Sequence, residues 1–211
     1  MNLEIKTDLK KITGEFLGLA KPGAECDAEI NDISSLENFE SFSKVCSKKG
    51  EHNNKDMASV AALLFEMQIK NNVPDEYSEM SDCFAEMVKT NKKMDVSESR
   101  DYVFFAYEVM RELEKLDNMT ECIINGDADG IYALAAQDDD ISCIALVNNS
   151  SREIMTDIII SGLPGRSTSI DYYSADEYNQ LSIVCNTDTK LEETKVMIAV
   201  PEYSVHMFKI R

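Results

Sequence analysis

The chain contains no tryptophan and only two histidines among its 211 residues. Sugar sites commonly use the flat faces of aromatic rings, so the missing tryptophan weakens a carbohydrate-binding role. His52 and His206 form no recognisable zinc spacing with the cysteines, and the sequence has no phosphate-binding or dinucleotide-binding glycine motif. The sequence therefore predicts no metal site and no cofactor.

Long apolar runs are also missing. No segment approaches the ~18 apolar residues that a membrane-spanning helix needs. The opening MNLEIKTDLKK carries charges where a secretory signal has an apolar run. We therefore expect a soluble, cytoplasmic protein without a membrane partner.

Positive charge is scarce, because 21 lysines and arginines face 39 aspartates and glutamates, for a formal net charge of −18. Nucleic-acid binding requires clustered basic residues, and anionic lipid surfaces repel an acidic protein. Both partners are therefore excluded, and a neutral carbohydrate or another protein remains. The hydrophobic content of 44% is sufficient for a sizeable core.

Six cysteines are present, and none forms a CxxC pair. Most lie within apolar patterns, which is typical of reduced, buried thiols in an intracellular protein. These cysteines are Cys26, Cys46, Cys83, Cys122, Cys143 and Cys185.

The first half of the chain reads as helical or partly α/β. From Thr7 onward, Leu9, Ile12, Phe16 and Leu19 have helical spacing and predict a helix that ends at the KPG of residues 21–23. A short extended piece is expected to follow, and then a second helix.

Two later helices have clearer patterns. We expect Asn53 or Asn54 to cap a helix over residues 56–70. We expect Ser97 to cap a helix that reaches Leu116, with Phe104 and Tyr107 on its apolar stripe. Such stripes are interpreted as protein core, not as a ligand groove. Weaker helical patterns cover residues 36–45 and 75–88.

The second half is a series of short apolar segments separated by turns. Turn residues such as NGDADG at 125–130 and GLPG at 162–165 separate these segments, and no helical period competes. Eight strands in about ninety residues predict a β-sandwich. The strands are expected at 121–124, 131–136, 142–148, 154–160, 167–173, 181–185, 195–200 and 203–210.

The predicted fold class is therefore α+β, with a helical or partial α/β N-terminal half followed by an antiparallel β-sandwich. The expected division is residues 1–118 for the first region and residues 119–211 for the sandwich. Acidic turns at Asp127, Asp129 and 138–140 offer hard oxygen ligands for calcium, but the glutamate of an EF-hand loop is absent. We interpret them as solvated hairpin turns.

Several segments resemble a known family. The stretch SCIALVNNSSREIMTDIIISGLPGRSTSIDYYSADE from Ser142, with VPEYSVHMFKI from Val200, is similar to the sandwich of β-xylosidase and α-iduronidase type glycoside hydrolases. The segments NNKDMASVAALLFEMQ from Asn53 and SRDYVFFAYEVMRELEKLDN from Ser99 resemble the last helices of their (β/α)8 barrel. The resemblance implies a truncated and degenerate C-terminal part of such an enzyme.

The resemblance also implies one remnant catalytic residue. In AEINDISSLENFESF, Glu37 with Asn38 corresponds to the family's nucleophilic glutamate, although the usual tryptophan between them is absent. Retaining hydrolysis needs two carboxyl groups about 5 Å apart, and the family's acid/base glutamate comes from an earlier barrel strand. A complete barrel takes about 250 residues. We therefore expect that this chain is not an enzyme by itself.

The function predicted on these grounds is a non-catalytic, glycoside-hydrolase-like protein with a structural or interaction role. One alternative is a carbohydrate-binding module that uses Tyr172, Tyr173 and Tyr178, although adjacent residues on a strand point to opposite faces. Another is half of a split hydrolase that a second chain completes, in which Glu37 matters. The apolar stripes of the predicted helices must be buried against other residues. We expect them to pack compactly within one chain, which slightly favours a monomer over a homodimer.

Overall fold

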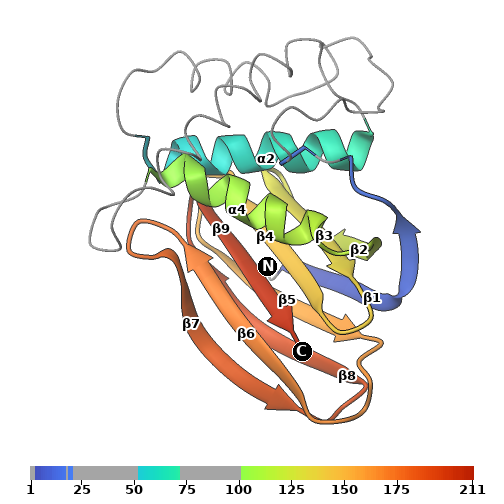
Figure 1. Cartoon of the computed structure of the whole chain (residues 1–211). Helices are drawn as coiled ribbons and strands as arrows, with labels where there is room; N and C mark the ends of the chain where they lie inside the picture. Colours follow the sequence, from blue (N-terminus) through green and yellow to red (C-terminus); the bar gives the residue numbers. More distant parts are fainter. Residues whose placement is uncertain (1–2, 18, 21–51, 72–100) are drawn as a thin grey trace.

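The computed structural model describes residues 3–17, 19–20, 52–71 and 101–211, which form one curled sheet with two helices on its outer face (Figure 1). This part of the chain is mainly β. The helices are α2 (Asn54–Lys70) and α4 (Tyr102–Glu114). The strands are β1 (Leu3–Gly14), β2 (Asn118–Asn125), β3 (Ile131–Gln137), β4 (Ser142–Asn148), β5 (Ile154–Ser161), β6 (Thr168–Ala175), β7 (Gln180–Thr189), β8 (Glu193–Val200) and β9 (Ser204–Ile210).

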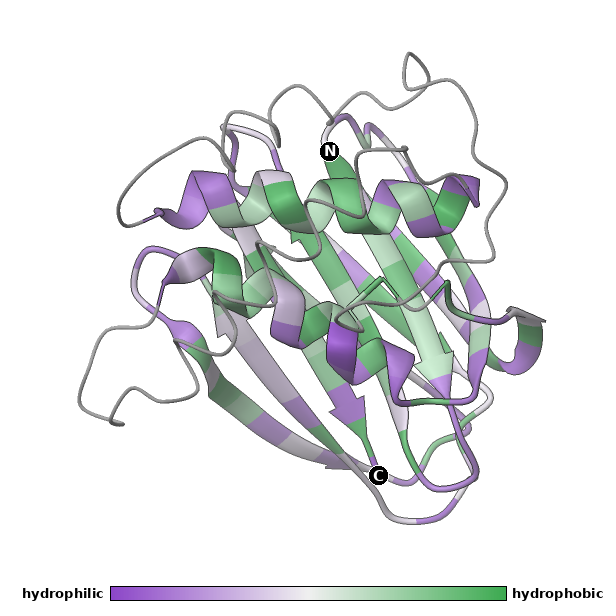
Figure 2. Cartoon of the chain, turned by 45° about the horizontal axis from the view of Figure 1, so that its top comes forward, coloured by the Kyte–Doolittle hydropathy of each residue, from purple (hydrophilic) through white to green (hydrophobic). Residues whose placement is uncertain are grey.

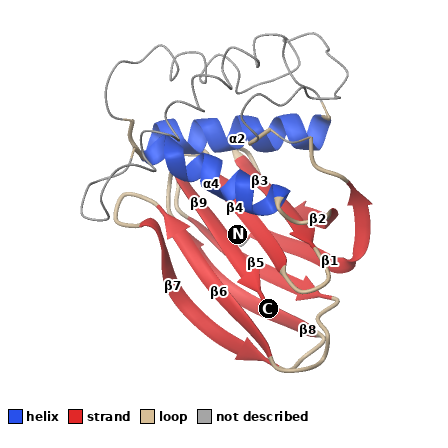
Figure 3. Cartoon of the chain, viewed as in Figure 1, coloured by secondary structure: helices blue, strands red, loops and turns tan. Residues whose placement is uncertain are grey.

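The nine strands hydrogen-bond in the order β7-β6-β9-β4-β3-β2-β1-β5-β8. Neighbouring strands are antiparallel, except that β1 and β5 run parallel. The sheet curls on itself, because apolar residues of β1 and β5 pack in one inner cluster with those of β4, β6 and β9 (Figure 3). Ile5 and Phe208 are completely buried in this cluster. The inner face of the sheet is thus the first of two cores.

The helix expected from Thr7 is wrong, because Leu3–Gly14 is strand β1. Alternate residues from Leu3 to Leu9 are buried, which is the period of two that a strand requires. The helical spacing was coincidental, since Ile12 is 58% exposed. Pairing with β2 on one side and β5 on the other holds the segment extended, and this tertiary pairing overrides the local pattern.

Helices α2 and α4 begin at well-formed caps. The side chain of Asn53 accepts from the Asp56 amide at 3.0 Å, and the Asp56 carboxylate accepts from the Asn53 amide at 3.0 Å. This capping box confirms Asn53, one of the two predicted caps, as the cap of α2. The cap of α4 is Asp101, which accepts from the Val103 amide at 3.0 Å, and not Ser97 as expected.

One contact joins the two helix starts. The other carboxylate oxygen of Asp101 lies 2.8 Å from Nδ1 of His52, the residue just before the Asn53 cap. The same aspartate thus caps α4 and holds the beginning of α2. The two helices consequently start at the same edge of the sheet (Figure 1).

The helices bury their apolar faces against the outer face of the sheet. Phe104 and Tyr107 are 3% and 6% exposed, in a cluster that includes Ala145 and Val205 of β4 and β9. Figure 2 shows that the central strands beneath the helices are apolar over most of their length. The apolar stripe of α4 is therefore covered within the chain, as the compact packing requires.

The sequence predicted the positions of the strands after residue 118, but it did not predict how these strands assemble. All eight strands predicted after residue 118 are present as β2–β9. They form one curled sheet together with β1, instead of a separate antiparallel sandwich behind a helical half. The division at residue 118 stays a prediction, although β1 of the first region lies within this sheet. The helices expected at 36–45 and 75–88 lie outside the described residues.

The acidic turn between β3 and β4 is closed by its own aspartate. Oδ1 of Asp138 accepts from the amides of Asp140 and Ile141, at 2.8 and 2.7 Å. Such a side-chain bond to the backbone two or three residues on is the usual role of aspartate in a turn. Asp138 therefore has a structural use that requires no calcium.

Cysteine burial is less uniform than expected. Cys143 is buried and Cys122 is partly buried, and burial raises the pKa of each thiol to about 12. Cys185 is exposed on β7, which corrects the expectation of a buried thiol. These three cysteines are free, whereas Cys26, Cys46 and Cys83 lie outside the described residues. Neither helix that the structure describes is both long and apolar enough to cross a membrane.

Candidate functional site

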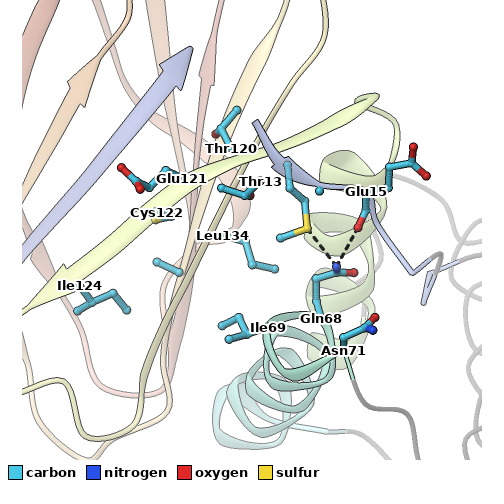
Figure 4. A pocket seen from close by; sticks show the side chains of 13 residues that line it. Thr13, Glu15, Gln68, Ile69, Asn71, Thr120, Glu121, Cys122, Ile124 and Leu134 are labelled. Carbon is cyan, nitrogen blue, oxygen red and sulfur yellow. Dashed lines mark hydrogen bonds between the residues drawn. The ribbon is translucent and has the colours of Figure 1, made fainter. Parts of the chain in front are cut away.

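A pocket with a volume of about 670 Å³ opens where the sheet splits beside the end of α2 (Figure 4). Strand β2 pairs with β3 only at residues 118–120, and from Glu121 onward it continues along β1 alone. The pocket lies in this gap, and it is lined by Thr13, Gly14, Glu15, Gln68, Ile69, Asn71, Met119, Thr120, Glu121, Cys122, Ile124, Ala133 and Leu134. We call it the split-sheet pocket.

The buried amide of Gln68 connects the walls of this pocket (Figure 4). Its Nε2 donates to the carbonyl of Glu15 at 3.2 Å and to the sulfur of Met119 at 3.0 Å. Its Oε1 accepts from the amide of Leu17 at 2.9 Å. One side chain thus ties α2 to β2 and to the segment that follows β1.

Thr120 contributes a buried hydroxyl to the pocket. The residue is 2% exposed, and its Oγ1 has no hydrogen-bond partner among the described residues. An unpaired buried polar group costs ~1–3 kcal/mol. A ligand in the pocket does not reach this hydroxyl, because it is buried within the sheet. The accessible polar side chains of the pocket are those of Thr13 and Asn71, which are exposed.

Two carboxylates line the pocket, on Glu15 and Glu121, and they do not face each other. The Glu121 carboxylate forms an ion pair with Lys11, so its charge is already balanced. The carboxylate of Glu15 points away from that of Glu121 (Figure 4). Retaining hydrolysis requires two carboxyl groups that face the same bond. The arrangement in this pocket suits binding better than hydrolysis.

The three tyrosines proposed as a sugar site do not come together. Tyr172 points into the inner cluster and stacks on Phe208, with ring centroids 4.8 Å apart. Tyr173 faces the helix layer, where Nζ of Lys209 lies 5.6 Å from its ring centroid. Tyr178 is 86% exposed in the turn after β6. The expectation that the adjacent tyrosines point to opposite faces is confirmed, and Glu37 lies outside the described residues.

His206 is the centre of a buried polar chain. Its Nδ1 lies 2.8 Å from the hydroxyl of Tyr172, and its Nε2 lies 2.7 Å from the hydroxyl of Ser204. The Ser204 hydroxyl donates to the carbonyl of Pro201 at 2.6 Å, so it accepts from Nε2. His206 and Ser204 are 0% exposed, so no substrate reaches this serine–histidine pair. His206 is therefore a structural residue of the sheet interior.

Asp176 lies near this series of polar side chains around His206. It also organises the turn between β6 and β7. Its carboxylate accepts from the hydroxyl of Ser174 at 2.5 Å and from the amides of Tyr178 and Asn179 at 2.8 and 3.0 Å. Burial raises the pKa of Asp176, but these bonds and those from the Asn179 side chain outweigh burial, so the pKa is lowered overall. The group is therefore a charged structural anchor.

Sequence reasoning missed the split-sheet pocket. Gln68 belongs to a segment quoted for the family resemblance, but nothing in its local pattern distinguishes it from other helix-end residues. The pocket depends on the register at which β2 leaves β3 and on the position of β1, which the sequence indicated as helical. A buried glutamine near the end of an apolar helix was the one available signal.

The fold is shared with parts of larger glycoside hydrolases. A glucosidase from Croceicoccus marinus is 13% identical, with a TM-score of 0.55 over 78% of this chain and 43% of that enzyme. A Paenibacillus polymyxa xyloglucanase of glycoside hydrolase family 44 is 12% identical, with a TM-score of 0.51 over 76% of this chain and 30% of its own. A family 30 endoxylanase from Clostridium papyrosolvens is 8% identical, with a TM-score of 0.50 and coverages of 76% and 39%.

These similarities show the fold alone. The chain spans less than half the length of each of these three hydrolases. No protein-family model matches the sequence, and no curated protein sequence matches it. The resemblance to glycoside hydrolases is thus confirmed at the level of a glycoside-hydrolase-like fold.

Proposed function

We propose that the chain is a non-catalytic, glycoside-hydrolase-like protein with an interaction role, and that the split-sheet pocket binds its ligand. The observation that carries the first part is the arrangement of the pocket's two carboxylates. The carboxylate of Glu121 is paired with Lys11, and that of Glu15 points away from it (Figure 4). Retaining hydrolysis needs two carboxyl groups that face the same bond.

The first prediction concerns hydrolysis. Purified chain is expected to hydrolyse no aryl β-xyloside, β-glucoside or iduronide above background, because the two carboxylates of the split-sheet pocket do not face the same bond. Release of the aryl group is the measurement, with an active retaining xylosidase as the positive control. A Glu37→Gln variant should give the same background. Turnover that disappears in this variant would contradict the proposal.

The binding part of the proposal rests on the chemistry of the pocket. Ile69, Ile124 and Leu134 supply apolar contacts, and the exposed side chains of Thr13 and Asn71 supply polar groups. Apolar walls with a few convergent polar groups are the usual composition of small-molecule sites. A neutral molecule with an apolar ring and at least one hydroxyl group fits this lining. An aryl β-xyloside is a suitable probe of that class.

The second prediction uses two threonines as a matched pair. Thr120→Val is expected to raise the free energy of unfolding by about 1 kcal/mol, because it removes an unpaired buried hydroxyl without changing the shape. The hydroxyl of Thr7 on β1 is equally buried but donates to the carbonyl of Glu121 at 2.8 Å. Thr7→Val should therefore lower the stability by about 1 kcal/mol. Urea unfolding measures both effects.

A variant at an exposed polar residue of the pocket tests the ligand. Calorimetric titration with the aryl β-xyloside should show binding to the unmodified chain and about tenfold weaker binding to Thr13→Val, the loss of one good hydrogen bond. Equal affinities would exclude the Thr13 hydroxyl from recognition. No binding to either protein would contradict the pocket as a site for this class of molecule.

Carbohydrate binding through an exposed aromatic ring is a second candidate function. Tyr178 is the member of the proposed tyrosine set whose ring is available, at 86% exposure. A Tyr178→Ala variant that loses binding to a xylan or glucan, while Thr13→Val keeps it, would favour this alternative. The opposite result would favour the split-sheet pocket.

A further inference from the structure

The turn after β2 contains the one Asn-Gly step of the sequence, Asn125–Gly126. Asn125 is the last residue of the strand, and both residues are exposed. An asparagine side chain loses ammonia when the backbone nitrogen of the next residue attacks its amide carbon. Glycine in the next position favours this attack, because it has no Cβ to obstruct the side chain and its backbone turns easily. Asn125 therefore has the local sequence that this reaction requires.

The surroundings of Asn125 leave its side chain able to react. Its Nδ2 donates to Oε1 of Glu4 on β1 at 3.4 Å, a long hydrogen bond that links two exposed side chains. Among the described residues this is the one partner of the Asn125 side chain. Gly126 has a φ of 120°, which residues with a side chain rarely adopt. The amide carbon of Asn125 is thus weakly held beside a nitrogen that no side chain shields.

Asn186 on β7 provides a contrast within the same sheet. It is exposed like Asn125, but its Nδ2 donates to the hydroxyl of Ser169 at 3.0 Å and also to the carboxylate of Asp171. The residue after it is Thr187, whose branched Cβ obstructs the backbone nitrogen. Asn186 therefore lacks both features that favour the reaction at Asn125.

The Asp129–Gly130 step later in the turn can form the same ring, but its backbone is held on both sides. The amide of Ile131 donates to the carbonyl of Ala128 at 2.8 Å, and the amide of Asn149 donates to the carbonyl of Gly130 at 2.8 Å. An ionised carboxylate is also a poorer electrophile than an amide. The reaction is therefore expected at Asn125 well before Asp129.

We propose that Asn125 is a site of spontaneous deamidation. The nitrogen of Gly126 forms a bond to Cγ of Asn125 and gives its proton to water. The bond from Cγ to Nδ2 then breaks, and the nitrogen leaves as ammonia after taking a proton from water. Water adds to either carbonyl of the resulting succinimide ring and opens it to aspartate or isoaspartate. The net reaction consumes water and releases ammonia, with no oxidation or reduction.

The product changes the contact between β1 and β2. Glu4 and Asn125 are paired residues of these antiparallel strands, so the new carboxylate lies beside that of Glu4. Like charges opposite each other destabilise a strand pair. Lys6, whose Nζ lies 3.0 Å from Oε1 of Glu4, offsets only part of this repulsion. Deamidation therefore weakens the end of the β1–β2 pair. This inference goes beyond the proposed function and does not depend on it.

The test is peptide mapping by mass spectrometry after storage of the folded chain at mildly acidic and mildly alkaline pH. The peptide that contains Asn125 should gain one mass unit and separate into aspartate and isoaspartate forms. The gain should be faster at alkaline pH, because loss of the Gly126 proton precedes ring formation. Asn186 is the internal control and should stay unchanged. Asn125→Gln should abolish the gain, because glutamine would have to form a larger ring.

Storage in urea shows whether the folded turn protects the residue. Asn125 should react in the folded chain as it does in the unfolded chain, since its side chain is exposed in both. A folded chain in which Asn125 stays intact, while the same residue reacts in urea, would overturn the proposal.

The effect on the strand pair is measured with Asn125→Asp, which has the aspartate product from the start. Its urea midpoint should be lower than that of Asn125→Gln, and the difference should shrink as sodium chloride screens the two carboxylates. Equal midpoints at low salt would show that the modification leaves the β1–β2 pair unchanged, which would contradict this part of the proposal.

Discussion

The protein is expected to lose about 2 kcal/mol of stability between pH 7.5 and pH 5.0 through His206 alone. Burial lowers the pKa of this imidazole from 6.5 to about 4, and the nearby Asp176 carboxylate offsets only part of that effect. Each pH unit of difference between folded and unfolded pKa corresponds to 1.36 kcal/mol. Because His206 is completely buried, solvent does not screen the effect.

The direction follows from which state binds more protons. Below pH 6.5 the unfolded chain protonates its histidine, while the folded chain keeps His206 neutral down to about pH 4. Acid therefore favours unfolding across this window. The stabilising contribution is complete above pH 6.5 and is lost as the pH falls toward 4. Asp176, whose folded pKa is lowered, contributes a loss of the same sign only at lower pH.

The hydrogen bonds explain why protonation is unfavourable. Nε2 donates to Ser204, so Nδ1 is assigned as the acceptor from the Tyr172 hydroxyl. A proton on Nδ1 would face a hydroxyl that already donates, and Tyr172 would have to turn its proton away. Burial raises the pKa of Tyr172 to about 12, so this hydroxyl keeps its proton throughout the window.

Urea unfolding at the two pH values measures this effect. A His206→Gln variant should be less stable than the original chain at pH 7.5, because a shorter amide does not satisfy both partners. It should lose much less stability than the original chain between pH 7.5 and 5.0. Equal losses in the two proteins would assign the pH dependence to other groups. The carboxylates titrate in both proteins, so their contribution to the loss of stability is removed when the two losses are compared.

Sequence pattern predicted the elements whose partners lie next to them in the chain. Strands β3 and β4 form a hairpin closed by the Asp138 turn, and both its apolar segments and its turn residues are visible locally. The cap at Asn53 was likewise predictable, because a capping box involves residues three apart. Elements whose partners lie close in the sequence can therefore be predicted from the local residue pattern.

Strand β1 shows where that approach fails. Its partners β2 and β5 lie more than 100 residues away, and the pairing holds Leu3–Gly14 extended. Only the first four alternations point to a strand, and the apolar residues from Leu9 to Leu19 mimic a helix. The position of β1 also decides that the sheet is one curled unit. The error in one element therefore changed the predicted architecture.

The candidate site was beyond sequence reasoning for a related reason. Thr120 is one threonine on one strand, and its hydroxyl is notable only because β2 leaves β3 at that point. Thr7, with the same residue type and burial, is paired. The difference between these two residues comes from register, which depends on contacts far apart in the sequence.

Replacement of Gln68 by alanine is expected to lower the free energy of unfolding by about 3 kcal/mol, roughly 1 kcal/mol for each of its three hydrogen bonds. Alanine favours helices more than glutamine, so a loss cannot come from helix propensity. Ile69→Ala is the control, since Ile69 also lines the pocket but is 54% exposed, and it should cost far less. Urea unfolding of both variants gives the comparison.

Hydrogen exchange shows whether the loss arises at the predicted place. The amide of Leu17 donates to Oε1 of Gln68, so its protection should disappear in Gln68→Ala. The amide of Ile5, inside β1, should keep its protection because strand pairing supports it. The variant should also weaken binding of the aryl β-xyloside, because the pocket wall formed by Glu15 and Met119 is no longer held. Retained protection at Leu17 would show that another group fixes this wall, and that Gln68 does not organise the split-sheet pocket.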